Sequence, residues 1–151
     1  MFEADCVFCR IASGEVACAR LWEDERFLAF LDINPNVLGM TLVITKDHHP
    51  SYAFGLPEPL YRDFLAAAKE VALLLDRKLG VFRTAMVMEG MGVNHAHIKL
   101  YPVHGIEKEF VEMWGPERVY FDKYEGYITT LLGPVADPQQ LERLAKRIRE
   151  E

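Results

Sequence analysis

The chain has 151 residues, 50% of them hydrophobic, which is enough to bury the core of one domain of the commonest size. Its 23 acidic residues outnumber its 17 basic residues, and the formal net charge is -6 at pH 7. This charge gives no electrostatic reason to expect binding to nucleic acid or to an anionic membrane. No apolar run approaches the roughly 20 residues of a membrane span, and the N-terminus lacks the order of a signal peptide, so we expect a cytoplasmic protein.

Five short segments rich in aliphatic and aromatic residues are typical of β-strands, and turn-forming residues separate them. These segments cover residues 19–24, 27–33, 40–45, 82–88 and 93–101. Between the third and the fourth, residues 58–79 carry apolar side chains at helical spacing, with prolines at the start and Gly80 directly after the end. A second helix is predicted after Asp137, whose carboxylate can cap it while Gln140 follows three residues later.

Strands that surround one helix and are mostly joined by short connections favour an antiparallel sheet with the helix packed across it. We therefore predict the α+β class, with a five-stranded antiparallel sheet, one main helix and a C-terminal helix. We expect a nucleotide-binding domain over residues 1–133 and, over residues 134–151, a C-terminal helical extension of the same domain. The segment 104–127 is irregular and aromatic. We interpret most of its aromatic residues as packing against the C-terminal helix, with a lid or a subunit contact as alternatives.

The last predicted strand carries two histidines and a lysine at alternating positions. Side chains of a strand alternate between its faces, so His95, His97 and Lys99 should share one face, opposite the apolar core. The turn before the strand holds Gly90 and Gly92, which let backbone N–H groups approach an anion closely. This pattern indicates a phosphate site, in which a neutral imidazole can act as nucleophile or base while a lysine supplies positive charge.

These residues resemble a known family. The segment NHAHIKLYP resembles the signature of the histidine triad (HIT) family, and CVFCRIASGE and FLDINPNVLGMTLVITKDHH match its N-terminal half in order and spacing. The resemblance covers about residues 6–104. It implies a HIT-like α+β unit with a five-stranded antiparallel sheet, a homodimer, and hydrolysis or transfer at the α-phosphate of a purine nucleotide. The middle histidine of the triad corresponds to His97.

The resemblance implies covalent catalysis. His97 would attack the α-phosphorus, a nucleotidyl-histidine would form, and water or another acceptor would resolve it. Substrates of this kind are nucleotidyl esters, phosphoramidates and dinucleoside polyphosphates. Lys99 and the backbone amides of Gly90, Met91 and Gly92 are the candidates for neutralising the phosphoryl oxygens.

The chain departs from the family pattern at three positions. Lys99 stands in place of the third histidine, Gly92 in place of a frequent Ser or Thr, and Met88 in place of an Asn that contacts phosphate in some members. A protonated lysine can stabilise an anion or donate a proton, but it cannot accept one. Two alternatives therefore remain. One is a zinc-stabilised nucleotide-binding protein with little turnover, and the other is a metal-dependent hydrolase that uses His95 and His97 as ligands.

A metal site is predicted from the N-terminal cysteines. Cys6 and Cys9 have the Cys-x-x-Cys spacing that lets two thiolates bind one metal ion, although the spacing alone is a weak signal. The resemblance supplies His48 and His95 as further ligands, which would complete a structural zinc site. Replacement of His48 by His49, and a reduced cysteine pair without metal, stay open as alternatives. We interpret Cys18 as a buried thiol.

A nucleoside pocket is predicted around Asp32, which follows an apolar strand. A carboxylate can accept two hydrogen bonds from the cis-diol of a ribose, although capping of a turn is an alternative role. The resemblance implies that Asp32 binds the ribose and that Ile33 lines the base. Other apolar side chains could contact a purine or belong to the core: Phe8, Ile11, Phe27 and Leu31. We expect His104 to lie at the surface or in a lid.

Overall fold

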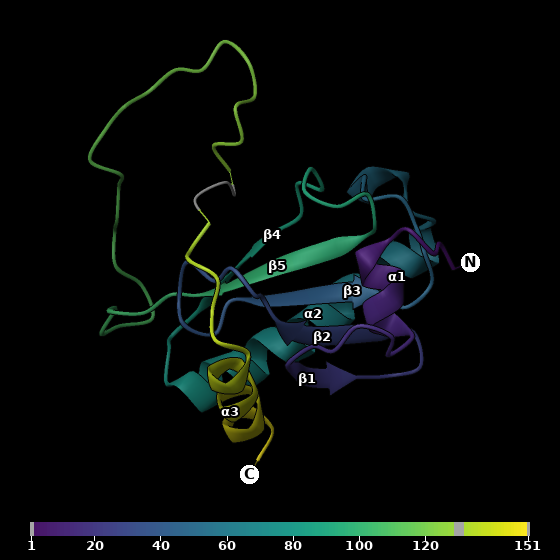
Figure 1. Cartoon of the computed structure of the whole chain (residues 1–151). Helices are drawn as coiled ribbons and strands as arrows, with labels where there is room; N and C mark the ends of the chain where they lie inside the picture. The colour runs from purple at the N-terminus through teal and green to yellow at the C-terminus, as the bar shows by residue number, and fades with distance from the viewer. Residues whose placement is uncertain (1, 129–131, 151) are drawn as a thin grey trace.

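The computed structural model describes residues 2–128 and 132–150. Its centre is a five-stranded sheet with the spatial order β1-β2-β3-β5-β4, in which every neighbouring pair is antiparallel (Figure 1). The strands are β1 (Arg20–Glu23), β2 (Phe27–Leu31), β3 (Thr41–Thr45), β4 (Thr84–Val87) and β5 (His97–Pro102). The helices are α1 (Val7–Ala12), α2 (Glu58–Leu79) and α3 (Pro138–Arg149), and a short 3-10 turn over Ala53–Gly55 precedes α2.

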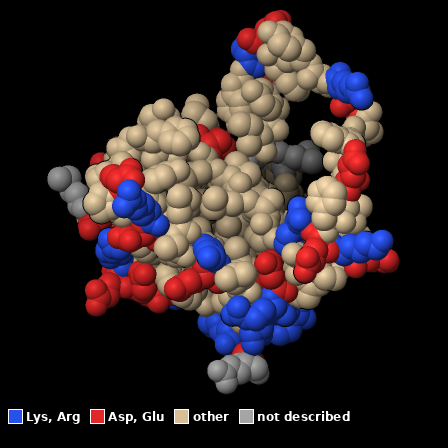
Figure 2. Space-filling model, turned by 180° about the vertical axis from the view of Figure 1, so that it is seen from behind, with Lys and Arg blue, Asp and Glu red and all other residues tan. Residues whose placement is uncertain are grey.

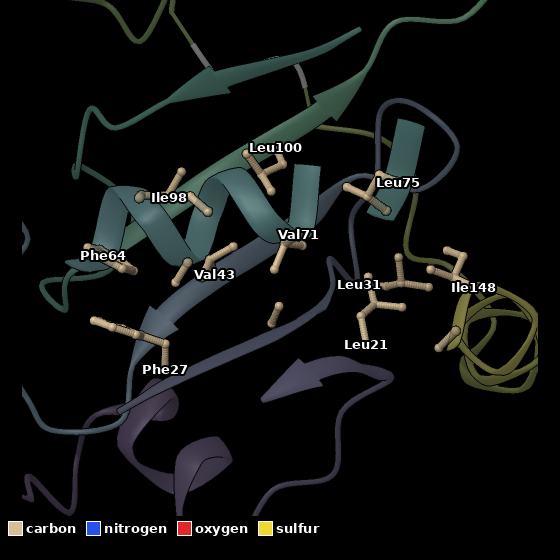
Figure 3. Close-up of a cluster of buried hydrophobic side chains, with 14 of the residues drawn as sticks. Leu21, Phe27, Leu31, Val43, Phe64, Val71, Leu75, Ile98, Leu100 and Ile148 are labelled. Atoms are coloured by element: carbon tan, nitrogen blue, oxygen red, sulfur yellow. The ribbon is translucent and has the colours of Figure 1, made fainter. Parts of the chain in front are cut away.

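Helix α2 covers one face of the sheet with the apolar stripe that its sequence predicts. It ends at Gly80, which adopts a φ of 65° in the left-handed region that glycine tolerates without a Cβ clash. Figure 3 shows the core between this helix and the sheet, formed by Phe64, Val71 and Leu75 of α2 and by Val43, Ile98 and Leu100 of the strands. The predicted α+β class and the packing of the main helix across the sheet are confirmed.

The opposite face of the sheet packs against α1. Leu42 and Ile44 alternate with Val43 along β3, so their side chains point away from α2. They form a second cluster with two residues of α1, Phe8 and Ile11, and with residues of β2. This second layer is smaller than the first because α1 has only 6 residues.

Helix α3 docks its apolar side on the same core as α2. Leu141, Ala145 and Ile148 are buried, and Figure 3 shows Ile148 beside Leu31. The Asp137 side chain caps the helix by accepting a hydrogen bond from a backbone N–H of the first turn. The predicted C-terminal helix is confirmed. Figure 2 shows basic side chains gathered near the C-terminus, where the last turn of α3 carries cations that favour the helix dipole.

Two expectations need correction. Strand β5 begins at His97, so His95 lies in the preceding loop, where the Ala96 N–H donates to the His49 carbonyl. Residues 106–128, which we call the arm, arch away from the sheet over most of their length and return toward it near Gly126, which is buried (Figure 1). Trp114 and Tyr120 on the arm are 85% and 88% exposed, so the interpretation that they pack against α3 is wrong.

No helix within residues 2–128 and 132–150 combines the length and the hydrophobicity needed to cross a bilayer.

The docking of α3 can be tested with Ile148→Ala. The side chain is fully buried, so its truncation should lower the free energy of unfolding by about 2–5 kcal/mol, measured by chemical denaturation. Arg143→Ala on the exposed side of the same helix should change it by no more than about 0.5 kcal/mol. Equal losses in the two variants would contradict the docked arrangement.

Candidate active site

A cavity of about 280 Å³ lies beside α1, on the sheet face opposite α2. Residues far apart in the sequence meet in its wall: Asp32 and Ile33 after β2, and His97 and Lys99 on β5. The rest of the wall is mostly apolar and includes Val7, Phe8, Ile11, Phe30, Leu42 and Val93. An apolar cavity with a few convergent polar groups is the usual form of a small-molecule site.

His97 is the first residue of β5, and its side chain reaches the cavity although it is only 3% exposed. Its Nδ1 lies 2.7 Å from the carbonyl oxygen of His95. A carbonyl can only accept, so Nδ1 carries the proton and Nε2 of the neutral ring keeps its lone pair. Burial lowers the pKa of His97, and the nearby cation of Lys99 lowers it further. The geometry therefore provides a neutral imidazole whose Nε2 can act on a bound ligand.

The ring of His97 is also held by packing. The Phe8 ring of α1 lies edge-on to it, with 5.4 Å between the ring centroids. Phe8 makes a similar edge contact with His95 at 5.7 Å. Phe8 of α1 thus packs against both His95 in the loop and His97 at the start of β5.

Lys99 shares the face of β5 with His97 and forms an ion pair with Glu89. The distance between Lys99 Nζ and Glu89 Oε1 is 2.9 Å, and the two side chains are only 13% and 7% exposed. Sequence reasoning did not assign Glu89 to the site. The strand register could have indicated it, because Val87 pairs with Lys99 and Glu89 follows Val87 by two residues on the same face.

The glycine turn before β5 is only partly directed at the cavity. Gly92 lines it, whereas the Met91 N–H donates to Glu89 Oε2 at 2.8 Å. Gly90 packs against Ser51, with a φ of 73°, and a Cβ there would lie 2.6 Å from the Ser51 carbonyl oxygen. The Ser51 hydroxyl donates to the Gly90 carbonyl at 2.7 Å. The close approach of Ser51 therefore explains why a glycine is needed at position 90. The Met91 amide already donates its hydrogen bond to Glu89.

Asp32 caps a turn and also lines the cavity. Its Oδ1 accepts a hydrogen bond from the Asn34 N–H at 2.7 Å, which caps the turn after β2. The same residue lines the cavity next to Ile33. Of the further apolar candidates, Phe8 and Ile11 reach the cavity, whereas Phe27 and Leu31 belong to the core under α2. Phe30 and Leu42 also reach it, and the sequence pattern of a buried strand did not distinguish them from core residues.

Tyr101 is a polar residue close to Asp32 and Glu89 that sequence reasoning did not single out. It follows His97 and Lys99 on the same face of β5, and among the described residues its hydroxyl is buried without a hydrogen-bond partner. Burial raises its pKa to about 12, and the negative charges of Asp32 and Glu89 contribute to the rise. The phenol is therefore protonated at neutral pH.

A second group of side chains forms a metal-binding geometry next to the cavity. The ligand atoms of Cys6, Cys9, His48 and His95 all lie within 4.8 Å of one another. The Cys6 sulfur is 3.3 Å from His95 Nδ1, and the Cys9 sulfur is 3.5 Å from His48 Nδ1. Within the described residues this cluster contains His48 and leaves out His49.

The outer nitrogens of both cluster histidines have partners. His95 Nε2 lies 2.7 Å from the Thr45 carbonyl oxygen, so it carries the proton and Nδ1 faces the sulfurs with its lone pair. His48 Nε2 lies 3.3 Å from the Glu3 carboxylate. Burial lowers the pKa of His95 to about 4, which keeps the ring neutral as a metal ligand must be. Two thiols and two imidazoles are a donor set that suits zinc.

Two histidines, His49 and His104, and one cysteine, Cys18, lie outside both groups. His104 is exposed and donates from Nε2 to the Leu38 carbonyl at 2.9 Å. Cys18 is half-buried, and burial raises the pKa of its thiol. His97 is absent from the metal cluster and uses Nδ1 for the His95 carbonyl. This arrangement disfavours a hydrolase that would chelate a metal ion between His95 and His97.

Comparison with known proteins agrees with this architecture. The model of the HIT domain matches residues 13–105. An uncharacterised HIT-like protein of Methanocaldococcus jannaschii is 33% identical over 123 residues, which cover 78% of this chain and 94% of that protein. The adenosine 5′-monophosphoramidase of Saccharomyces cerevisiae is 29% identical, with coverages of 80% and 77%. The crystal structure of a hypothetical histidine triad nucleotide-binding protein from Sulfolobus tokodaii superposes with a TM-score of 0.71 at 26% identity, over 95% of this chain and 89% of that one. The chain belongs to the histidine triad family.

Proposed function

We propose that the protein is a nucleotide hydrolase or nucleotidyltransferase that cleaves at the α-phosphate through a covalent nucleotidyl-histidine. The observation that carries the proposal is the buried, neutral His97, whose Nδ1–H is fixed by the His95 carbonyl and whose Nε2 is left for a ligand in the cavity. The yeast relative is an adenosine 5′-monophosphoramidase, which makes a nucleoside phosphoramidate the first substrate to test.

The cavity has an apolar part and a polar part, which suit the base and the phosphate of a nucleotide respectively. A purine base fits the apolar wall, with Ile33 at its rim, and the ribose hydroxyls would donate to Asp32. The α-phosphate would then lie beside His97, Lys99 and Gly92, which line the same cavity. The ammonium group of Lys99 and the amide of Gly92 are the donors available for its oxygens.

Each step has a named group in this site. Nε2 of His97 attacks the phosphorus while the bond to the leaving group breaks, and the ring becomes positively charged. The hydrogen bond from Nδ1–H to the His95 carbonyl strengthens as that charge develops. Water or another nucleotide acceptor then takes the nucleotidyl group from His97.

A nucleotide-binding protein with little turnover is the second candidate. The ion pair between Lys99 and Glu89 favours it, because the carboxylate compensates the cation that should stabilise the phosphoryl oxygens. The same binding geometry would then serve recognition rather than cleavage. Formation of a covalent adduct distinguishes the two candidates.

We further propose that Cys6, Cys9, His48 and His95 bind a structural zinc ion. The four ligand atoms match the number and the chemistry of a tetrahedral site. Zinc would supply a crosslink between the start of α1 and the loop that precedes β5. The crosslink would also fix the orientation of the His97 ring, because the backbone carbonyl of the ligand His95 accepts the hydrogen bond from His97 Nδ1. The purine preference and a homodimer are proposed on the family resemblance.

The nucleophile is tested with His97→Asn. This variant should lose at least about three orders of magnitude in kcat for release of adenosine monophosphate from adenosine 5′-phosphoramidate, because the bond-forming nitrogen is removed. Intact-mass spectrometry of quenched wild-type reactions should show an adenylyl adduct that the variant lacks. Lys99→His should keep or raise turnover, and His104→Asn, a change at an exposed histidine, should leave it unchanged. Full turnover by His97→Asn would remove His97 from the mechanism.

The zinc site is tested by metal analysis. Wild-type protein purified without chelator should contain about one zinc ion per chain, and Cys9→Ala should lower both the zinc content and the Tm. Cys18→Ala, which removes a thiol outside the cluster, should change neither. A wild-type content below about half an equivalent would count against the site.

A further inference from the structure

We infer that the site selects the leaving group by charge: Glu89 lies in the wall of a separate leaving-group chamber, which favours a neutral or cationic amine and disfavours a phosphate chain. This inference rests on the proposed function and narrows the substrate class that it leaves open.

The chamber is a second cavity of about 250 Å³. It shares Gly92, Lys99 and Leu132 with the first cavity, so the two meet at Lys99. Among the described residues, its wall also includes Glu89 and Met91 from the β4–β5 turn and Tyr124 and Gly126 from the arm. His97 and Asp32 line only the first cavity.

The order of groups along the two cavities matches the order of groups in a substrate. The base and ribose are assigned to the apolar end near Asp32, and the α-phosphate to the part that His97 and Lys99 share. In an in-line displacement the leaving group departs on the side of the phosphorus opposite the nucleophile. The second cavity meets the first at Lys99, and His97 is not part of its wall. We therefore assign this second cavity to the leaving group.

Glu89 determines the electrostatic character of this space. Its side chain is only 7% exposed, and its Oε1 lies 2.9 Å from Lys99 Nζ. The pair carries no net charge, so Lys99 is already compensated before a substrate binds. Additional phosphates in the chamber would therefore find no uncompensated cation there, and their charge would lie close to the Glu89 carboxylate. The raised pKa of Tyr101, to which Asp32 and Glu89 contribute after burial, reflects the same negative field.

An amine suits the same wall. Its N–H groups can donate to Glu89, and the Tyr124 ring can contact an alkyl chain or a cation. Both proton transfers that cleavage requires can then take place at Lys99. As the bond from His97 Nε2 to phosphorus forms, the P–N bond breaks and the departing nitrogen takes a proton from the Lys99 ammonium. When water displaces His97 from phosphorus, the neutral Lys99 accepts the proton that the water releases.

The experiment compares binding of adenosine monophosphate and adenosine triphosphate in magnesium-free buffer by isothermal titration calorimetry. Wild-type protein should bind the monophosphate at least about tenfold more tightly, a difference of about 1.4 kcal/mol. Glu89→Gln should reduce that ratio by about tenfold, because it removes the carboxylate and leaves Lys99 uncompensated. Glu58→Gln is the matched control, since it breaks an exposed carboxylate pair with Arg62 and removes the same charge. It should leave the ratio unchanged.

A kinetic comparison provides the second measurement. For the wild type, kcat/KM should be at least about tenfold higher for adenosine 5′-phosphoramidate than for diadenosine tetraphosphate, and Glu89→Gln should narrow the gap. Glu89→Asp, which retains the charge, should keep the preference. If Glu89→Gln folds poorly, the wild-type binding ratio and the wild-type kcat/KM ratio still test the inference, because neither needs a variant.

Two outcomes are distinguishable. If the wild type binds the triphosphate as tightly as the monophosphate, or if folded Glu89→Gln keeps the wild-type ratio, charge selection by Glu89 is refuted while the proposed function stands. If wild-type protein binds neither nucleotide, the proposed function fails and the inference fails with it.

Discussion

The hydrogen bond from His97 Nδ1 to the His95 carbonyl is the interaction on which the site depends. His95 contributes to the site with both its ring and its backbone carbonyl. Its ring turns Nδ1 toward Cys6, while its carbonyl orients the ring of His97, two residues further along the chain. The metal cluster and the candidate nucleophile are therefore connected through a single residue of backbone, and displacement of the cluster would move the reactive ring. A metal ion bound by the proposed ligands would thus influence His97 without contact with the substrate.

The two-layer fold supplies the environment that this interaction needs. Helices α2 and α3 share one face of the sheet, whereas α1 covers only part of the other, so a cavity remains beside Phe8 and Ile11. The apolar wall keeps His97 neutral by burial, and the polar groups converge where the strands β2 and β5 bring Asp32 and Lys99 to it. The ion pair of Lys99 with Glu89 then places a compensated charge at the junction of two cavities.

Strong local signals made much of the fold predictable from sequence. The apolar period of residues 58–79 and Gly80 defined α2, and residue alternation placed His97 and Lys99 on one face. Features that depend on contacts between distant residues were not predictable in the same way. Helix α1 has too few residues to show a period, and β5 starts at His97 because the backbone before it pairs with His49 instead. The four-residue metal cluster was expected only through the family resemblance, because the Cys-x-x-Cys spacing does not identify its partners.

Attack by His97 on phosphorus is best tested with a crystal structure of the protein with adenosine monophosphate bound. We expect the phosphorus to lie about 3–3.5 Å from His97 Nε2, while Nδ1 still donates to the His95 carbonyl. A nucleotide whose phosphate lies outside the reach of His97, or a ring that turns Nδ1 toward the phosphate, would contradict it.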